Sequence, residues 1–146
     1  MLLISKFTAG ILTAGLILFS CSPSRHNEKG VTAAMKYYDR LILKLDADAI
    51  AQLYTVDGNL GGIAIGRDSI RNFLSSFKNI KVLSQASTTS SIKMGRDTAI
   101  QKGNYTQTAV ISGKDTVKVT GEYTARWQWI TGDGWHIKQM ITKPTN

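Results

Sequence analysis

The chain has 146 residues, of which 42% are hydrophobic and 19% are charged, so its length and composition indicate one globular domain and exclude a disordered chain. Lys and Arg number 18 against 10 Asp and Glu, which favours acidic partners, but the basic residues are scattered and no nucleic acid partner is expected. The single cysteine excludes an intrachain disulfide and a cysteine zinc site.

Residues 1–20 have the features of a signal peptide. Lys6 provides a positive start, and the 13 residues 7–19 are largely apolar, which is too short to cross a bilayer core of about 30 Å but suits a signal peptide. Leu18-Phe19-Ser20-Cys21 resembles the bacterial lipobox, in which a small residue precedes a cysteine that receives lipid. We therefore expect cleavage after Ser20 and lipidation of Cys21, which would anchor the exported protein to a bacterial membrane in the cell envelope.

The stretch behind the leader is polar. Residues 21–30 read CSPSRHNEKG, with a proline and no hydrophobic periodicity, and this composition predicts a flexible tether in which His26 is solvated. The folded domain is expected to span residues 31–146, without an internal repeat.

Two helices are predicted at the start of this domain. Residues 31–45 carry apolar side chains at spacings of three and four, which is typical of an amphipathic helix. A second helix is expected to start at Asp46 or Asp48, to place Tyr54 on its inner face and to end at a turn formed by Asp57-Gly58.

A short strand over residues 60–65 and a third helix are expected next. Asp68 can cap that helix. Its apolar residues have the spacing of a helix that buries one face, and they are Ile70, Phe73, Leu74 and Phe77.

From about Ile80 the period of the apolar residues changes to two, which predicts strands over residues 83–94, 98–111 and 116–130 and a last strand after Gly132-Asp133-Gly134. In the last strand one predicted face is apolar and the other polar. The first comprises Trp135, Ile137, Gln139 and Ile141, and the second His136, Lys138, Met140 and Thr142. Helices followed by consecutive antiparallel strands predict an α+β domain, with three helices packed on a curved, mainly antiparallel sheet.

Three parts of the chain, taken together, carry a resemblance to a known family. They are residues 46–54 with Asp57, residues 66–70 with Phe73 and Phe77, and Gly121-Glu122-Tyr123 with Trp127 and Asp133-Gly134-Trp135. In order and spacing they resemble the second helix, third helix and last hairpin of the nuclear transport factor 2-like superfamily, which includes ketosteroid isomerase and the SnoaL-like polyketide cyclases. The resemblance implies a cone-shaped, cystatin-like domain with a pocket between its helices and the concave face of its sheet, a fold that hosts enzymes, binders and assembly modules alike.

The resemblance also implies which side chains line that pocket. Tyr38 falls where ketosteroid isomerase has a tyrosine that donates a hydrogen bond to a developing oxyanion, although a core tyrosine is the alternative. Gln101 and Gln139 lie on predicted inward faces, where an amide must find a partner from protein, water or ligand. The candidate pocket residues are Tyr38, Tyr54, Gln101, Tyr105, Tyr123, Trp127 and Gln139.

The chain lacks the acids that isomerase chemistry needs. The position of the family's base falls on Gly62, and that of its second acid falls near Ala125 or Arg126. No zinc-protease motif, Cys/His cluster or phosphate-binding glycine loop is present, so neither a metal nor a cofactor is expected. We therefore expect non-catalytic binding of a small apolar ligand or a protein partner.

Two other functions stay open. One is an enzyme of the isomerase, cyclase or dehydratase kind that uses Tyr38 as its oxyanion donor. The other is an envelope module that assembles through its sheet, for example as a homodimer. Its outward face would carry several cations and one acid, namely Lys102, Lys118, Arg126, Lys138 and Glu122.

Overall fold

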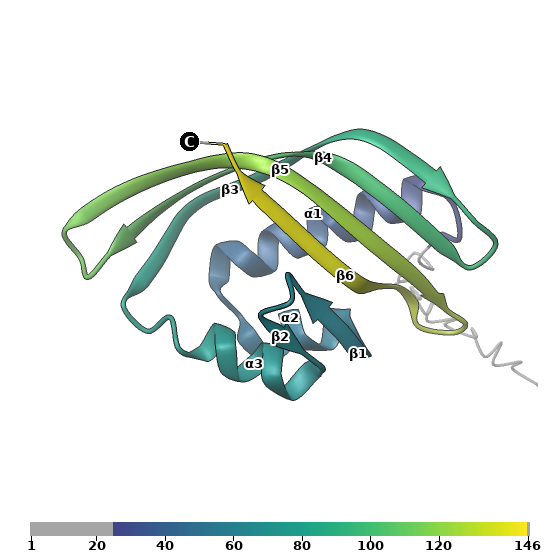
Figure 1. The fold of residues 1–146 in the computed structure, drawn as a ribbon, viewed down its shortest axis with the longest axis horizontal. Helices are drawn as coiled ribbons and strands as arrows, with labels where there is room; N and C mark the ends of the chain where they lie inside the picture. The colour runs from purple at the N-terminus through teal and green to yellow at the C-terminus, as the bar shows by residue number, and fades with distance from the viewer. Residues whose placement is uncertain (1–24, 146) are drawn as a thin grey trace, which may run out of the picture.

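The computed structural model describes residues 25–145, so the predicted signal peptide and Cys21 lie outside the described residues. Three helices lie on the concave side of one bent sheet (Figure 1). The helices are α1 (Glu28–Lys44), α2 (Ala47–Leu53) and α3 (Arg67–Ser75), and none of these is long and apolar enough to span a membrane. The strands are β1 (Tyr54–Leu60), β2 (Ala64–Ile65), β3 (Ile80–Met94), β4 (Thr98–Ile111), β5 (Asp115–Ile130) and β6 (Gly134–Pro144). The predicted α+β architecture is confirmed.

The six strands form one sheet in the order β2-β1-β6-β5-β4-β3. All neighbouring strands are antiparallel except β1 and β6, which pair in parallel with Tyr54 opposite Ile137. This pairing places the first strand beside the last one, an arrangement that the consecutive antiparallel pattern of the sequence does not predict.

Helix α1 starts before the predicted domain boundary. The Asn27 side chain accepts a hydrogen bond from the Gly30 amide (3.0 Å), and this cap starts the helix at Glu28 rather than at residue 31. The segment before it is also fixed, because the imidazole of His26 stacks on Trp129 with 4.4 Å between ring centroids. Residues 25–30 are thus part of the folded domain, which corrects the predicted tether.

The second helix ends earlier than predicted. It stops at Leu53, and Tyr54 opens strand β1, so Asp57 and Gly58 lie within a strand instead of forming a turn. β6 pairs with β1 on both sides of this segment, at Tyr54 and again at Asn59 and Leu60, and this pairing holds the strand extended. The turn lies at residues 61–63, which divide the predicted strand 60–65 into the end of β1 and the short β2.

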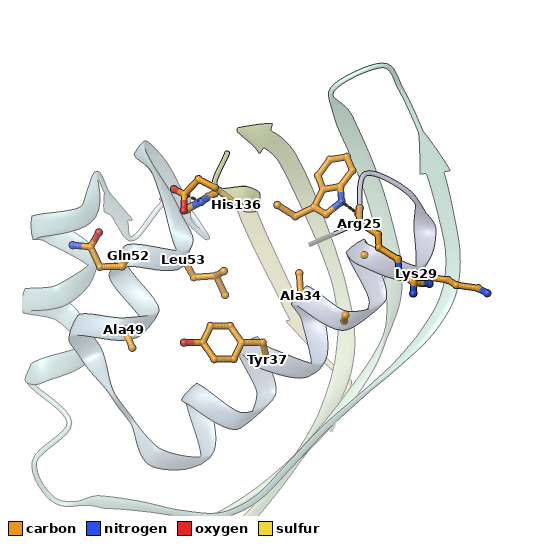
Figure 2. Close-up of a pocket in the computed structure, with 12 residues that line it drawn as sticks. Arg25, Lys29, Ala34, Tyr37, Ala49, Gln52, Leu53 and His136 are labelled. Atoms are coloured by element: carbon orange, nitrogen blue, oxygen red, sulfur yellow. Dashed lines mark hydrogen bonds and ion pairs between the residues drawn. The ribbon is translucent and has the colours of Figure 1, made fainter. Parts of the chain in front are cut away.

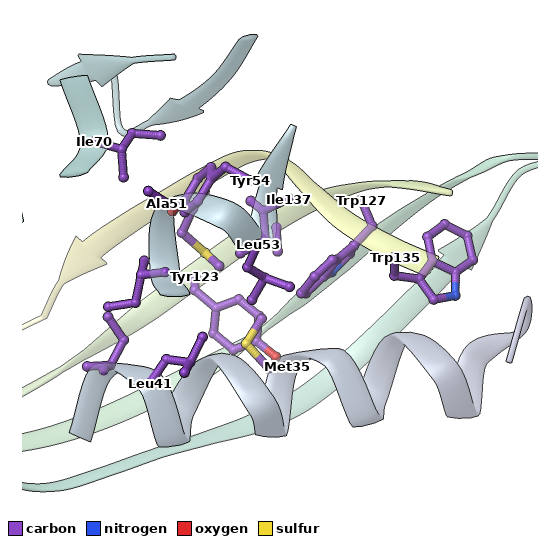
Figure 3. Packing of buried hydrophobic residues seen from close by; sticks show 14 of the residues in the cluster. Met35, Leu41, Ala51, Leu53, Tyr54, Ile70, Tyr123, Trp127, Trp135 and Ile137 are labelled. Atoms are coloured by element: carbon purple, nitrogen blue, oxygen red, sulfur yellow. The ribbon is translucent and has the colours of Figure 1, made fainter. Parts of the chain in front are cut away.

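The core lies between the helices and the sheet (Figure 3). Trp127 is 1% exposed, and its indole donates a hydrogen bond to Gln101 (3.0 Å). The amide of Gln101 in turn donates to the hydroxyl of Thr89 (2.8 Å). Both ends of this buried amide therefore have protein partners, as buried polar groups require.

A β-bulge in β6 exchanges the two faces of the last strand. Arg126 pairs with Gln139 but Trp127 pairs with Ile137, which leaves Lys138 as the extra residue. Beyond the bulge Met140 is 2% exposed and Ile141 is 44% exposed. The predicted alternation of β6 is therefore wrong after Ile137, because one inserted residue reverses the direction of every later side chain.

The outward face of the sheet carries charge of both signs. Lys102, Glu122 and Arg126 are exposed there. Lys138 forms an ion pair with Asp57 of β1, and this pairing lowers the pKa of the Asp57 carboxyl below its ordinary value. The predicted outward cations are thus only partly available to an acidic partner.

Candidate functional site

A cleft of about 830 Å³ opens between the first half of α1, helix α2 and the start of β6 (Figure 2). Its volume lies in the range of small-molecule sites, about 300–1,000 Å³. Figure 2 shows apolar side chains of α1 and α2 along its middle, Arg25 and Lys29 at one end, and Gln52 and His136 toward the other. The lining residues are Arg25, Lys29, Gly30, Ala33, Ala34, Tyr37, Ala49, Gln52, Leu53, Asp133, Trp135 and His136.

Small residues on α1 create this space. Gly30, Ala33 and Ala34 face the cleft, and larger side chains there would fill it. Gly30 also lets the chain before the helix approach closely, since a Cβ at this position would lie 1.7 Å from the carbonyl oxygen of Arg25. That carbonyl accepts a hydrogen bond from the indole of Trp135 (2.9 Å), which fixes the wall at this end.

The cleft contains a buried histidine that the sequence places on the outward face. His136 is 7% exposed because the first four residues of β6 are covered on both faces of the strand. Its Nε2 lies 2.9 Å from an oxygen of Asp133, and its Nδ1 is buried without a hydrogen-bond partner among the described residues. One nitrogen is therefore engaged and the other is shielded, so neither is presented to the cleft as a free base.

A second cavity, of about 90 Å³, lies inside the cone between α1 and the sheet. Tyr38, Tyr105 and Tyr123 meet there, beside Gln85 and other residues of β3, β4 and β6. The α1 wall is fixed to β3 because the carboxylate of Asp39 accepts a hydrogen bond from the amide of Gln85 (3.0 Å). This cavity is well below the range of about 300–1,000 Å³ that is usual for small-molecule sites, so it is small for an organic ligand.

The phenol of Tyr38 lies deep in the domain, although the residue as a whole is only partly buried because it lines this cavity. Burial raises the pKa of Tyr38 to about 12, against a smaller lowering by the nearby hydroxyl of Tyr54. Tyr54 is 0% exposed, and its hydroxyl makes no hydrogen bond of standard geometry with the described residues. Burial raises its pKa well above the ordinary value, and the proximity of Tyr38 raises it further.

The seven candidate residues therefore separate into three groups. Tyr38, Tyr105 and Tyr123 line the inner cavity. Tyr54, Gln101 and Trp127 are core residues that line neither cavity. Gln139 also lines neither, because the bulge at Lys138 turns Met140 inward in its place.

No family model matches the chain, and no curated protein matches it in sequence. Solved structures do match. A ketosteroid isomerase-like protein from Erwinia carotovora atroseptica superposes with a TM-score of 0.71 at 18% identity, over 80% of this chain and 94% of that one. A nuclear transport factor 2-like superfamily protein from Salmonella enterica serovar Typhimurium gives a TM-score of 0.69 at 20% identity, over 81% and 90% of the two chains. This domain has the nuclear transport factor 2-like fold.

A third neighbour agrees with this assignment. A nuclear transport factor 2-like protein with a cystatin-like fold from Novosphingobium aromaticivorans superposes with a TM-score of 0.65 at 16% identity, covering 80% of each chain. The resemblance seen in the sequence is thereby confirmed for the fold. At such identities a shared fold does not imply a shared activity, so function has to be argued from the site.

The positions that the resemblance assigns to isomerase acids carry no acid in this nuclear transport factor 2-like domain. Gly62 lies in the exposed turn between β1 and β2, where its amide donates to Asn59 (2.7 Å), and it lines neither cavity. Ala125 is buried in β5, and Arg126 is exposed on the outward face. Among residues 25–145, no group of three or more His, Cys, Asp or Glu side chains could hold a metal ion.

Sequence reasoning missed the larger cleft, although α1 contains a signal for it. Gly30, Ala33, Ala34 and Tyr37 follow the spacing of a second helical face beside the predicted apolar stripe. A face of small residues ending in an aromatic ring is a surface against which a ligand can lie. The volume in front of that face depends on how α2 and β6 pack, and this was not readable from the sequence.

The buried phenols should make this nuclear transport factor 2-like domain sensitive to alkaline pH. The pKa of Tyr38 rises from 10.0 to about 12 on folding, so its neutral form contributes stability in full below pH 10.0. That contribution is lost as the pH rises through about 12. Tyr38→Phe keeps the ring and removes the titrating group, so its stability should fall less steeply than that of the wild type over this range. Urea unfolding at a series of alkaline pH values measures the difference, and equal slopes would contradict it.

Proposed function

We propose that the domain binds a small, largely apolar ligand in the cleft between α1, α2 and β6 without converting it. The observation that carries the proposal is the cleft itself, about 830 Å³ in volume and lined by Ala34, Tyr37 and Leu53 with a few polar groups at its ends. Small-molecule sites have this composition, in which apolar area supplies affinity and a few polar groups fix orientation. The nuclear transport factor 2-like fold is compatible with such a role.

The chemistry of the lining residues supports binding rather than turnover. The carboxylate of Asp133 is engaged by His136, whose second nitrogen is shielded from the cleft. Two further carboxylates lie outside the cleft, since Asp57 is paired with Lys138 and Glu122 is exposed on the outward face. A neighbour of this fold is ketosteroid isomerase-like, but proton transfer needs a base within reach of the ligand, and these groups do not supply one.

The binding test uses neutral apolar probes and a variant that fills the cleft. Octanamide, decanamide and naphthamide should raise the melting temperature of the protein, as a ligand of the native state does. Ala34→Phe should abolish that rise, because Ala34 lines the cleft and a phenyl ring would occupy the space. Ala86→Phe is the matched control, since Ala86 is exposed on β3 and lines neither cavity.

Two results would contradict the proposal. One is the absence of stabilisation by any neutral or anionic amphiphile, and the other is equal stabilisation of the wild type and Ala34→Phe. Chemical conversion of a bound probe, seen by mass spectrometry, would instead favour the enzyme alternative.

We also propose that Cys21 carries lipid and anchors the domain to a bacterial membrane in the cell envelope. The support is the apolar stretch of residues 7–19 followed by Ser20 and Cys21, since several acyl chains hold a soluble domain at a membrane where one chain does not. Mass spectrometry of the full chain expressed in a bacterium should find acylation at Cys21. Cys21→Ser should release the protein from the membrane fraction, and an unmodified wild-type chain would disprove the anchor.

A further inference from the structure

We infer that the ligand of the cleft is an amphiphilic carboxylate, whose apolar part lies along α1 and α2 and whose anionic head lies between Arg25 and Lys29. The inference rests on the proposed function and names the chemical class of the ligand. It comes from the distribution of charge around the cleft, which differs between the two ends.

The positive end of the cleft carries two cations without anionic partners. Arg25 and Lys29 both line it, and Figure 2 shows them together at one end. Neither forms an ion pair with a residue of the described chain, whereas Arg71 and Lys138 each do. Glu28 lies between them in sequence and lines a neighbouring hollow that Lys29 also lines, but Glu28 forms no ion pair with Lys29 and does not line the cleft. The two cations are therefore available to an anion that enters the cleft.

Helix α1 adds to the positive potential at this end. It has 17 residues and begins at Glu28, so the positive end of its dipole lies beside Arg25 and Lys29. Toward the other end of the cleft lie Gln52 and His136, and the acid Asp133 is paired with His136, so an anionic head would find no unpaired cation among the lining residues there. These charges fix one orientation, with the head at the start of α1 and the apolar part directed toward Leu53 and Ala49.

The donors at the positive end fit a carboxylate better than a phosphate. The guanidinium of Arg25 can hold two carboxylate oxygens at once, and Lys29 adds a point charge. The side chain of Asn27 already occupies the amide of Gly30, so the helix end offers fewer free amides for the third oxygen of a phosphate. We therefore commit to a carboxylate with one acyl chain or ring system.

The test compares probes that have the same apolar skeleton. Octanoate and octanamide have the same chain and differ in the head group, an anionic carboxylate against a neutral amide. Trp135, which lines the cleft, reports binding by its fluorescence, with calorimetry as a second readout. Octanoate should bind about fivefold more tightly than octanamide, the preference expected for two partly exposed ion pairs. High salt should reduce the preference, because exposed charges are screened.

Arg25→Gln and Lys29→Gln together should remove the preference for octanoate over octanamide, because neither glutamine carries a charge. The matched control is Lys81→Gln with Lys114→Gln, which makes the same change of net charge at exposed positions outside the cleft. The control should keep the full preference for octanoate.

The outcomes separate this inference from the function on which it rests. Equal binding of octanoate and octanamide to the wild type, or a preference that survives in Arg25→Gln/Lys29→Gln, would overturn the inference and leave the binding function standing. Tighter binding of octyl phosphate than of octanoate would overturn the choice of a carboxylate. Failure of every amphiphile to bind would remove the proposed function itself.

Discussion

Met140→Asp should destabilise the domain by about 4 kcal/mol or more, whereas Ile141→Asp, one residue further along the same strand, should change its stability by less than about 1 kcal/mol. The bulge at Lys138 is the reason, because it leaves Met140 2% exposed and Ile141 44% exposed. A carboxylate at position 140 would be buried beside the inner cavity, whose lining residues include no cation to pair with it. Urea unfolding followed by tryptophan fluorescence measures both changes.

The comparison between these two variants tests the register of β6 directly. Uninterrupted alternation from Trp135 would place Ile141 inside and Met140 outside, and the order of the two effects would be reversed. Met140→Leu is the control for packing, since a swap that conserves volume should lower stability by less than about 1.5 kcal/mol. A larger loss in Ile141→Asp than in Met140→Asp would show that the bulge is absent in solution.

Trp127→Ala should lower the free energy of unfolding by about 3–5 kcal/mol, the range measured when a large buried aromatic side chain is removed. Trp127 is 1% exposed, and its indole donates to the fully buried Gln101. The substitution therefore leaves a cavity and also an amide oxygen without a donor. Trp127→Phe keeps most of the ring and should isolate the second effect, about 1–3 kcal/mol for a buried acceptor left unpaired.

A second substitution at Gln101 separates packing from hydrogen bonding. Combining Gln101→Leu with Trp127→Phe removes the unpaired oxygen, so the double variant should be more stable than the sum of the two single changes predicts. Additive effects in chemical unfolding would indicate that the indole–amide hydrogen bond contributes little to stability. The hydroxyl of Thr89 loses the amide donor of Gln101 in the single variant Gln101→Leu and in the double variant alike. That loss therefore cancels when the two variants are compared.

Side-chain periodicity was sufficient to predict the general architecture. The residues 98–111 predicted as a strand coincide with β4, and the apolar spacing in α1 and α3 identified both helices. What periodicity could not supply was the outcome of long-range pairing. The backbone after Leu53 becomes a strand because β6 lies beside it, and the local sequence, with Asp57-Gly58, suggests a turn instead.

The candidate site was harder to predict than the fold. Alternation correctly placed Tyr105 and Tyr123 on the concave face, where they meet Tyr38. It failed at Gln139 because a single inserted residue reverses the faces of a strand and leaves no mark in the composition. The larger cleft is a volume left unfilled between α1, α2 and β6. A pattern of residue types indicates which face of an element a side chain occupies, but it does not indicate how much space lies in front of that face.

The parallel pairing of β1 with β6 affects the order in which this protein can fold. Tyr54 and Ile137 lie opposite each other, so the contact joins the first and last strands of the sheet across most of the chain. Contacts between distant residues form slowly, because a long loop must close before they give any gain in energy. The six-stranded sheet therefore cannot be completed before β6 is in place. Until then the edge of β1 that β6 covers is open to strands of other molecules, which makes the late arrival of β6 a point of risk for aggregation.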